Sequence, residues 1–207
     1  MGGGGGGLMR WSVFGYYGLG SVNPSDINTL ASQAGTTPKL GSVTNNTIYG
    51  GGLGYRMTPR IQFIGEFDIQ EAKSLTTTSS PSIANAGFDL SQDEVWAIIN
   101  YSLIMDKAVE VYVGAGVGYP TYCHLNYQST VMTQYDAVKT VGFLGQAGIR
   151  MMLGRIFNIY FEGGYQSLVS TTLNADVGGA PLTTATGSNA KMDMSGVRGE
   201  AGLTINF

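Results

Sequence analysis

The chain has 207 residues, of which 43% are hydrophobic and 12% are charged, and its formal net charge at pH 7 is -3. With no cluster of Lys or Arg, this balance argues against a nucleic-acid partner, which needs several cations on one face. No apolar run approaches the roughly 18 residues of a membrane helix, so a helical membrane protein is excluded. The 32 glycines and 12 tyrosines favour strands and turns, because Gly weakens helices and aromatic residues suit pleated surfaces.

Residues 1–8 consist of Met1, six glycines and Leu8, without the charged n-region or the apolar h-region of a signal peptide. We interpret this segment as a leader added for expression in place of a removed export signal, with a native Gly-rich linker as the alternative. Residues 9–207 are expected to form one domain, because one strand pattern occupies them throughout.

Eight segments of this domain alternate apolar and polar side chains, as strands with one apolar face do. The first segment carries aromatic residues on both faces, so its orientation stays open. The third is the clearest, since Ile61, Phe63 and Phe67 alternate with Gln62, Glu66 and Asp68. We expect the strands over residues 9–22, 46–57, 60–72, 91–103, 108–122, 140–151, 157–166 and 195–207.

The connections between these segments are alternately very long and very short. Short turns follow the second, fourth and sixth segments, at Thr58-Pro59, Met105-Asp106-Lys107 and Gly154-Arg155. Long polar connections follow the others, and we expect loops over residues 23–45, 73–90, 123–137 and 170–191. An even strand count with short turns at one end and long loops at the other is typical of bacterial outer-membrane barrels.

We therefore predict an all-β fold, an eight-stranded antiparallel up-and-down transmembrane β-barrel. A soluble lipocalin-like barrel is the main alternative, and its apolar faces would point inward around a ligand. Aromatic residues favour the membrane barrel, because lipid selects an aromatic girdle at each interface. The apolar faces carry them near the short-turn end at Trp11, Tyr55, Tyr101, Phe157 and Phe207, and near the long-loop end at Tyr49, Tyr119 and Tyr165.

The last segment ends in Gly-Glu-Ala-Gly-Leu-Thr-Ile-Asn-Phe, with Leu203, Ile205 and Phe207 on its apolar face. With this ending and the eight-strand pattern, residues 9–207 resemble the small eight-stranded outer-membrane barrels of Gram-negative bacteria, the OmpA/OmpX-like group. The resemblance implies an integral protein of the bacterial outer membrane, surrounded by lipid and lipopolysaccharide. It also implies that Phe207 completes the signal offered to the outer-membrane assembly machinery.

The charged residues of the strands fall on the less apolar face, which lines the narrow lumen of a membrane barrel. We interpret them as a lumenal network of salt bridges and hydrogen bonds, because unpaired charge in such a space is costly. A gate or ion path, or a carboxylate pair for acid–base catalysis, are the alternatives. The candidate residues are Arg56, Glu66, Asp68, Glu110, Arg150, Glu162, Arg198 and Glu200.

Glycines occupy the same inner face on two segments, at Gly50, Gly52 and Gly54 and at Gly114, Gly116 and Gly118. Eight strands leave an interior only just wide enough for side chains to fill. The glycines therefore either accommodate large neighbours such as Tyr112 and Tyr160, or leave a water-filled cavity or narrow conduit.

Cys123 and His124 are the single Cys and the single His of the chain, so a disulfide or a Cys/His metal site has little scope. Lipid A palmitoyltransferases and deacylases resemble this architecture and use a His with a Ser near the external interface, where His124 and Ser129 would lie. No longer motif of either family is present. We therefore predict no enzymatic activity, no catalytic residue, no cofactor and no metal.

The function predicted from the sequence is a non-enzymatic integral outer-membrane barrel with a polar, salt-bridged lumen. Its long external loops would serve structural or surface-interaction roles toward a surface ligand that the sequence does not identify, and nucleic acid is not an expected partner. A narrow channel or small-ligand conduit is the alternative, and a lipid A-modifying enzyme comes last.

Overall fold

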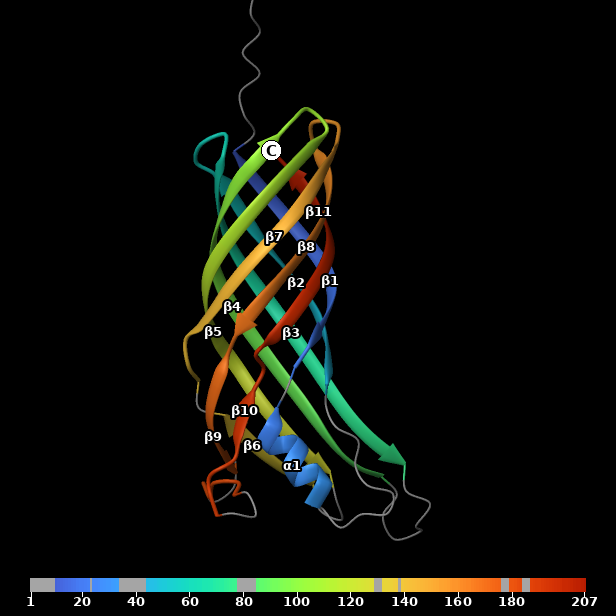
Figure 1. The fold of residues 1–207 in the computed structure, drawn as a ribbon, viewed down its shortest axis with the longest axis vertical. Helices are drawn as coiled ribbons and strands as arrows, with labels where there is room; N and C mark the ends of the chain where they lie inside the picture. The colour runs from blue at the N-terminus through green and yellow to red at the C-terminus, as the bar shows by residue number, and fades with distance from the viewer. Residues whose placement is uncertain are drawn as a thin grey trace, which may run out of the picture.

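The computed structural model describes residues 10–22, 24–33, 44–77, 85–128, 132–137, 139–175, 179–183 and 187–207, so the leader 1–8 lies outside the described residues. One end of the molecule carries short hairpin turns and the other carries the additional strands and the helix (Figure 1). In chain order the elements are β1 (Trp11–Ser21), α1 (Ser25–Gln33), β2 (Asn45–Arg56), β3 (Ile61–Thr77), β4 (Asn85–Met105), β5 (Val109–Gln128), β6 (Met132–Ala137), β7 (Gly142–Leu153), β8 (Phe157–Ser167), β9 (Val169–Ala175), β10 (Lys191–Asp193) and β11 (Gly196–Asn206).

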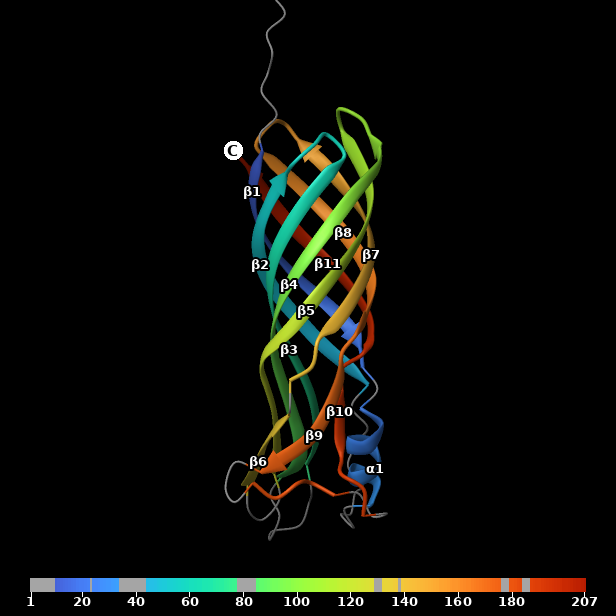
Figure 2. The same cartoon turned by 90° about the vertical axis from the view of Figure 1, so that its left-hand side faces the viewer.

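Eight of these strands close into an antiparallel barrel. They follow the order β1-β2-β3-β4-β5-β7-β8-β11, and β11 pairs back with β1. The closing register aligns Val13 with Ile205 and Gly15 with Leu203. At the short-turn end the seam is completed by the Phe207 amide, which donates to the Trp11 carbonyl at 3.0 Å. The predicted eight-stranded antiparallel barrel is confirmed, and Figure 2 shows the closed cylinder from a second side.

The outer face of the barrel is apolar and the inner face is polar, as the alternation predicted. The exposed large apolar side chains include Phe63 and Phe67 on β3 and Val113 and Val117 on β5. The first strand, whose orientation the sequence left open, turns Trp11, Val13, Tyr17 and Leu19 outward and buries Ser12 and Tyr16. Its inner face is fixed by the Tyr16 hydroxyl, which donates to the lumenal carboxylate of Asp68.

The three short turns lie where the sequence predicted them. In the first, the Thr58 hydroxyl accepts from the Ile61 amide at 3.0 Å. In the second, the Asp106 amide donates to the Val109 carbonyl at 2.8 Å. In the third, Gly154 has a φ of 92°, a left-handed conformation that glycine adopts without a steric penalty.

The expectation of long loops is wrong for much of their length, because strands continue through them. β3 and β4 remain paired from Ala72 with Leu90 as far as Thr77 with Asn85, within the predicted loop 73–90. β4 has 21 residues, whereas a membrane-spanning strand needs about 9–11. About half of β4 therefore extends beyond the membrane. Outside lipid neither strand face must be apolar, so the amphipathic pattern used for prediction ends before the strand does.

The other predicted loops also contain regular structure. The loop 123–137 contains the end of β5 and all of β6, whose pairing runs from His124 with Asp136 to Gln128 with Met132. The loop 170–191 contains most of β9, which pairs with β6 and with β10. The loop 23–45 contains α1, and the side chain of Asp26 near its N-terminus accepts from the Lys191 amide at 2.9 Å. An acidic residue in the first turn complements the helix dipole.

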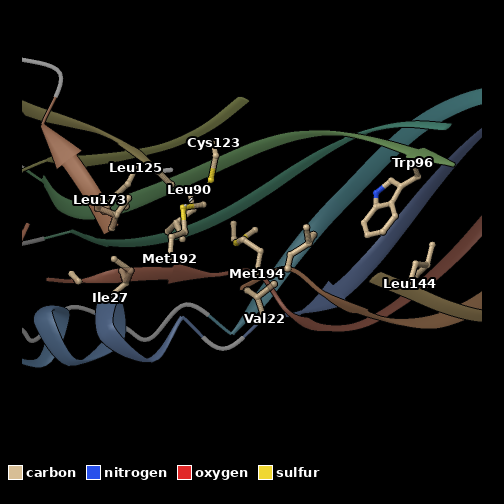
Figure 3. Packing of buried hydrophobic residues seen from close by; sticks show 14 of the residues in the cluster. Val22, Ile27, Leu90, Trp96, Cys123, Leu125, Leu144, Leu173, Met192 and Met194 are labelled. Atoms are coloured by element: carbon tan, nitrogen blue, oxygen red, sulfur yellow. Dashed lines mark hydrogen bonds between the residues drawn. The ribbon is translucent and has the colours of Figure 1, made fainter. Parts of the chain in front are cut away.

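A cluster of buried apolar side chains lies at this outer end. We call this region the cap, and it consists of α1, β6, β9, β10 and the ends of β3, β4 and β5 that extend beyond the membrane. Figure 3 shows Leu90, Leu125, Leu173 and Met192 pointing toward one another, while Trp96 lies apart, toward the barrel. The cluster continues into the barrel at Ile64, Trp96, Ile98 and Leu144, and its buried members in the cap are Val22, Ile27, Ala72, Leu90, Cys123, Leu125, Ala137, Leu168, Leu173, Ala190, Met192 and Met194. The strand extensions and α1 are thus packed together by apolar burial and form an ordered structure above the barrel.

The helix α1 has nine residues, and the described part of the chain contains no helix with the length and hydropathy of a membrane span.

Replacing Val113 or Phe161, both exposed on the outer face, with Arg is expected to lower the free energy of unfolding by about 2–4 kcal/mol, the penalty for a cation near the bilayer midplane. Tyr119→Arg, in the outer aromatic girdle, is the control for depth and should cost about 0–1 kcal/mol. The measurement is urea unfolding of each variant in lipid vesicles. Equal losses at the two depths would contradict the placement of the membrane.

Candidate functional site

The structure places the eight charged residues that the sequence assigned to the lumen on its inner face, where seven of them form two groups and Glu162 lies apart. The group nearer the short turns is centred on Glu110, which is buried on β5. Both of its carboxylate oxygens accept from Arg56 Nη2 at 2.9 Å, and Oε2 also accepts from Arg150 Nη1 at 2.9 Å. The Ser102 hydroxyl donates to the same carboxylate. One carboxylate therefore holds two guanidinium groups.

This group braces the barrel from one wall to the other. Arg56 lies on β2 and reaches Glu110 on β5, which is three strands away. Arg150 lies on β7, donates to Gln62 Oε1 on β3 at 3.1 Å, and places its guanidinium 5.1 Å from the centre of the Tyr112 ring. The hydrogen bonds of Arg56 to Glu110 and of Arg150 to Gln62 thus connect strands that share no backbone pairing, and the cation–π contact adds to the pairing between β7 and β5.

The second group lies nearer the cap and is centred on Arg198, which is only 3% exposed. From β11 its guanidinium reaches across to β3, where it contacts Glu66 Oε1 at 3.0 Å and Asp68 Oδ2 at 2.8 Å. It also pairs with Glu200 on its own strand. This group is the inverse of the first, because one guanidinium holds three carboxylates.

Glu162 stands apart from both groups. Its strand neighbour across the β8–β11 ladder is Glu200, another acid. In the described part of the barrel it forms no salt bridge, and its Oε2 instead accepts from Gln146 Nε2 at 3.0 Å. Gln146 also donates to Asn100 Oδ1 at 3.1 Å. An amide relay thus occupies the middle of the lumen between the two charged groups.

The sequence analysis missed Glu94, which is fully buried on the inner face of β4. Its carboxylate accepts from Gln70 Nε2 at 3.0 Å and from Trp96 Nε1 at 2.7 Å. Nearer the cap, Gln70 Nε2 donates to Gln166 Oε1 at 3.1 Å, and Gln166 Nε2 donates to Gln70 Oε1 at 3.0 Å. The signal was present, since Glu94 alternates with the outward residue Val95.

The lumen is filled by side chains around the inward glycines. A Cβ added at Gly118 would overlap the Trp96 ring, one added at Gly148 would overlap the Tyr112 ring, and one at Gly52 would lie 2.8 Å from Phe14. A cavity in the described part of the lumen has a volume of about 10 Å³ and is lined by residues that include Tyr112, Tyr160 and Glu162. That volume is room for about one water molecule. Some inward glycines therefore accommodate rings, whereas Gly54, Gly114 and Gly116 accommodate the side chains of Gln62, Asn100 and Ile98.

Cys123 and His124 lie in the extension of β5 outside the membrane. The Cys123 thiol donates to Gln92 Oε1 at 3.3 Å, and burial raises its pKa to about 12. His124 Nδ1 lies 2.8 Å from Asp136 Oδ1, and its ring stacks on Tyr122. Ser129 lies outside the described residues. Among the described side chains, no cluster of three or more His, Cys, Asp or Glu could hold a metal ion.

The fold defines a class, the integral β-barrels of the bacterial outer membrane. A family model described as "Outer membrane protein beta-barrel domain" matches residues 8–180, so the chain belongs to that family. No curated protein sequence matches the chain.

Three solved structures share this fold with the chain. OprG of Pseudomonas aeruginosa is 16% identical, with a TM-score of 0.58 over 97% of this chain and 98% of OprG. Neisserial surface protein A is 13% identical, with a TM-score of 0.56 over 95% of this chain and 97% of that one. Ail, the attachment invasion locus protein of Yersinia pestis, in complex with the heparin analogue sucrose octasulfate, is 12% identical, with a TM-score of 0.51 over 96% and 98%.

Removing the charge at the centre of the second group, by Arg198→Ala, is expected to lower the free energy of unfolding by about 3–5 kcal/mol, because three buried carboxylates lose their counter-ion. In double-mutant cycles, Arg198→Ala with Asp68→Asn should show a coupling energy of about 0.5–3 kcal/mol. The matched cycle with Glu162→Gln should show less than about 0.5 kcal/mol. Equal coupling in both cycles would contradict the pairing described above.

Proposed function

We propose that this protein is a non-enzymatic integral outer-membrane barrel whose lumen is closed and whose ordered cap serves structural or surface-interaction roles. The observation that carries the proposal is the reach of Arg56 and Arg198 across the lumen to buried carboxylates at 2.8 to 3.0 Å. An ion crossing the lumen would have to break both groups and pass the Tyr112 and Tyr160 rings between them. Each broken buried pair costs several kcal/mol, so passage would be rare.

A narrow channel or small-ligand conduit is the second candidate. The excess of acid near the cap end of the lumen favours it, because Arg198 is the partner of three carboxylates, Glu66, Asp68 and Glu200. Glu94 and Glu162 lie in the same part of the lumen and form no salt bridge with a described residue. A surplus of carboxylates would attract cations into any opening that formed. We favour the closed lumen because side chains fill the space around the cavity.

The cap gives the protein a shaped outer surface. We infer that any surface partner contacts this region, because it projects beyond the membrane on a rigid barrel. A polyanion such as the one bound to Ail is not the partner that its charges favour. The described outer-end residues include the acids Asp26, Glu71, Asp89, Asp93, Asp136 and Asp193 against Lys73, Lys139 and Lys191.

At the other end, Phe207 is exposed on the lipid face and its backbone pairs with Trp11. We propose that the segment ending at Phe207 is the signal that the outer-membrane assembly machinery binds, before the backbone of β11 pairs with β1. Lipid and lipopolysaccharide are the expected surroundings of the finished barrel.

The closed lumen predicts that the folded protein in planar bilayers gives no stepwise conductance. A positive control is the triple variant Trp96→Gly, Tyr112→Gly and Tyr160→Gly, which removes the rings beside the inward glycines and should conduct if it folds. Steady single-channel steps from the unmodified protein would establish the conduit instead. If the triple variant does not fold, Tyr112→Gly alone serves as the control.

The non-enzymatic proposal predicts that lipid A from cells expressing the protein has the same acyl chains, by mass spectrometry, as lipid A from cells expressing His124→Ala. Among the described residues, the His124 and Asp136 pair is the feature that most favours chemistry, since a carboxylate orients the imidazole as it does in hydrolytic sites. An acyl chain gained or lost with the unmodified protein and unchanged with His124→Ala would show an enzyme.

A further inference from the structure

The short-turn end of the barrel carries a ring of exposed cations, which we call the rim cations. Each of the three turn regions contributes one, Arg60, Lys107 and Arg155, and Arg10 precedes β1 at the same end. Asp106 is the one acidic side chain in these turns as the structure describes them. None of the four rim cations takes part in a salt bridge with a described residue. The rim therefore has a net positive charge that the protein itself does not neutralise.

Two of the rim cations lie at a defined depth. Arg10 Nη1 lies 3.5 Å from the Tyr55 hydroxyl, and Arg60 Nη1 lies 3.5 Å from the Tyr101 hydroxyl. Tyr55 and Tyr101 belong to the aromatic girdle at the short-turn end, and Tyr55 packs on Trp11 with ring centres 4.8 Å apart. Girdle aromatics sit at the level of lipid headgroups. The two guanidinium groups are thus held where lipid phosphates lie, and they do not project away from the membrane.

The opposite end of the molecule has the opposite sign, since its described acids outnumber its lysines. In outer-membrane barrels the short turns face the periplasm, so the positive end meets the inner leaflet. Guanidinium and ammonium groups bind phosphate oxygens through charge-assisted hydrogen bonds. An acidic periplasmic protein would need cations directed outward from the turns, whereas Arg10 and Arg60 are held against lipid-facing tyrosines.

We propose that the rim cations bind the phosphate headgroups of anionic phospholipids in the inner leaflet of the outer membrane, and so concentrate those lipids around the periplasmic end. The binding is independent of whether the lumen conducts.

The chain contains a probe for this binding at the right place. Trp11, beside Arg10 and Tyr55, is 50% exposed on the lipid face, whereas Trp96 is 3% exposed inside the lumen. Lipids with brominated acyl chains quench an adjacent tryptophan, so they should act on Trp11 and not on Trp96. The Trp11→Phe variant measures the fluorescence of Trp96 alone and should be insensitive to bromine.

The experiment refolds the full chain into vesicles of phosphatidylcholine and phosphatidylglycerol at equal mole fractions, with either one lipid or the other brominated. The expected result is that phosphatidylglycerol binds next to Trp11 at least about fivefold more strongly than phosphatidylcholine, which is the factor that a single cation supplies at an anionic surface. The preference should weaken in high salt, because exposed charges are screened.

The fourfold variant R10Q/R60Q/K107Q/R155Q should bring the ratio to about one. The matched control K73Q/K139Q/K191Q removes lysines from the cap and should keep the full preference. If the fourfold variant does not fold, R10Q/R60Q and K107Q/R155Q are measured separately, and each should lose part of it. Three outcomes would overturn the proposal. The unmodified protein would bind phosphatidylglycerol and phosphatidylcholine equally, the preference would remain without the rim cations, or it would disappear when the cap lysines are replaced.

Discussion

In the hydrocarbon region of a membrane, each backbone N–H and C=O group must find its hydrogen-bond partner within the protein, because lipid chains cannot form hydrogen bonds and water is absent. The chain meets this requirement only when β11 returns to β1 and aligns Val13 with Ile205. Closure then fixes which side chains face inward. Three features follow from that seam. They are the burial of Arg198 and Glu110, the apolar outer band, and the filling of the space beside the inward glycines by other side chains.

A lumen closed in this way has no wide solvent space, so a buried charge is stabilised by partners of the opposite sign. Glu110 pairs with Arg56 and Arg150, and Arg198 pairs with Glu66, Asp68 and Glu200. Arg56 with Glu110, and Arg198 with Glu66 and Asp68, join strands that share no backbone pairing, so these contacts resist shear of the cylinder. The cost of taking ions out of water is offset only while the geometry of each group is kept. The lumenal network is therefore both a filling and a brace.

The sequence predicted the barrel well because lipid imposes a period of two on each spanning strand. The inward placement of Glu66 and Arg198 follows from that period alone. Their partners could not be predicted, since reaching from β11 to β3 depends on barrel tilt and register, which no local pattern encodes. Glu94 was missed although it alternates with Val95. The strand extensions escaped for another reason: Ala72 and Leu90 are buried in the cap while Lys73 is exposed, so the apolar face turns inward there, opposite to its direction in the membrane.

The cap core has a consequence for how the protein folds. Its side chains come from positions as far apart as Val22, Leu90, Leu125 and Met192, so no local segment can assemble it. Loop-closure entropy makes such non-local contacts late. The extended strands of β3, β4 and β5 provide the surface on which α1 and β10 settle, and they exist only once those strands have paired. The outer end is thus completed after the membrane part, so a folded cap indicates that the barrel strands have already paired.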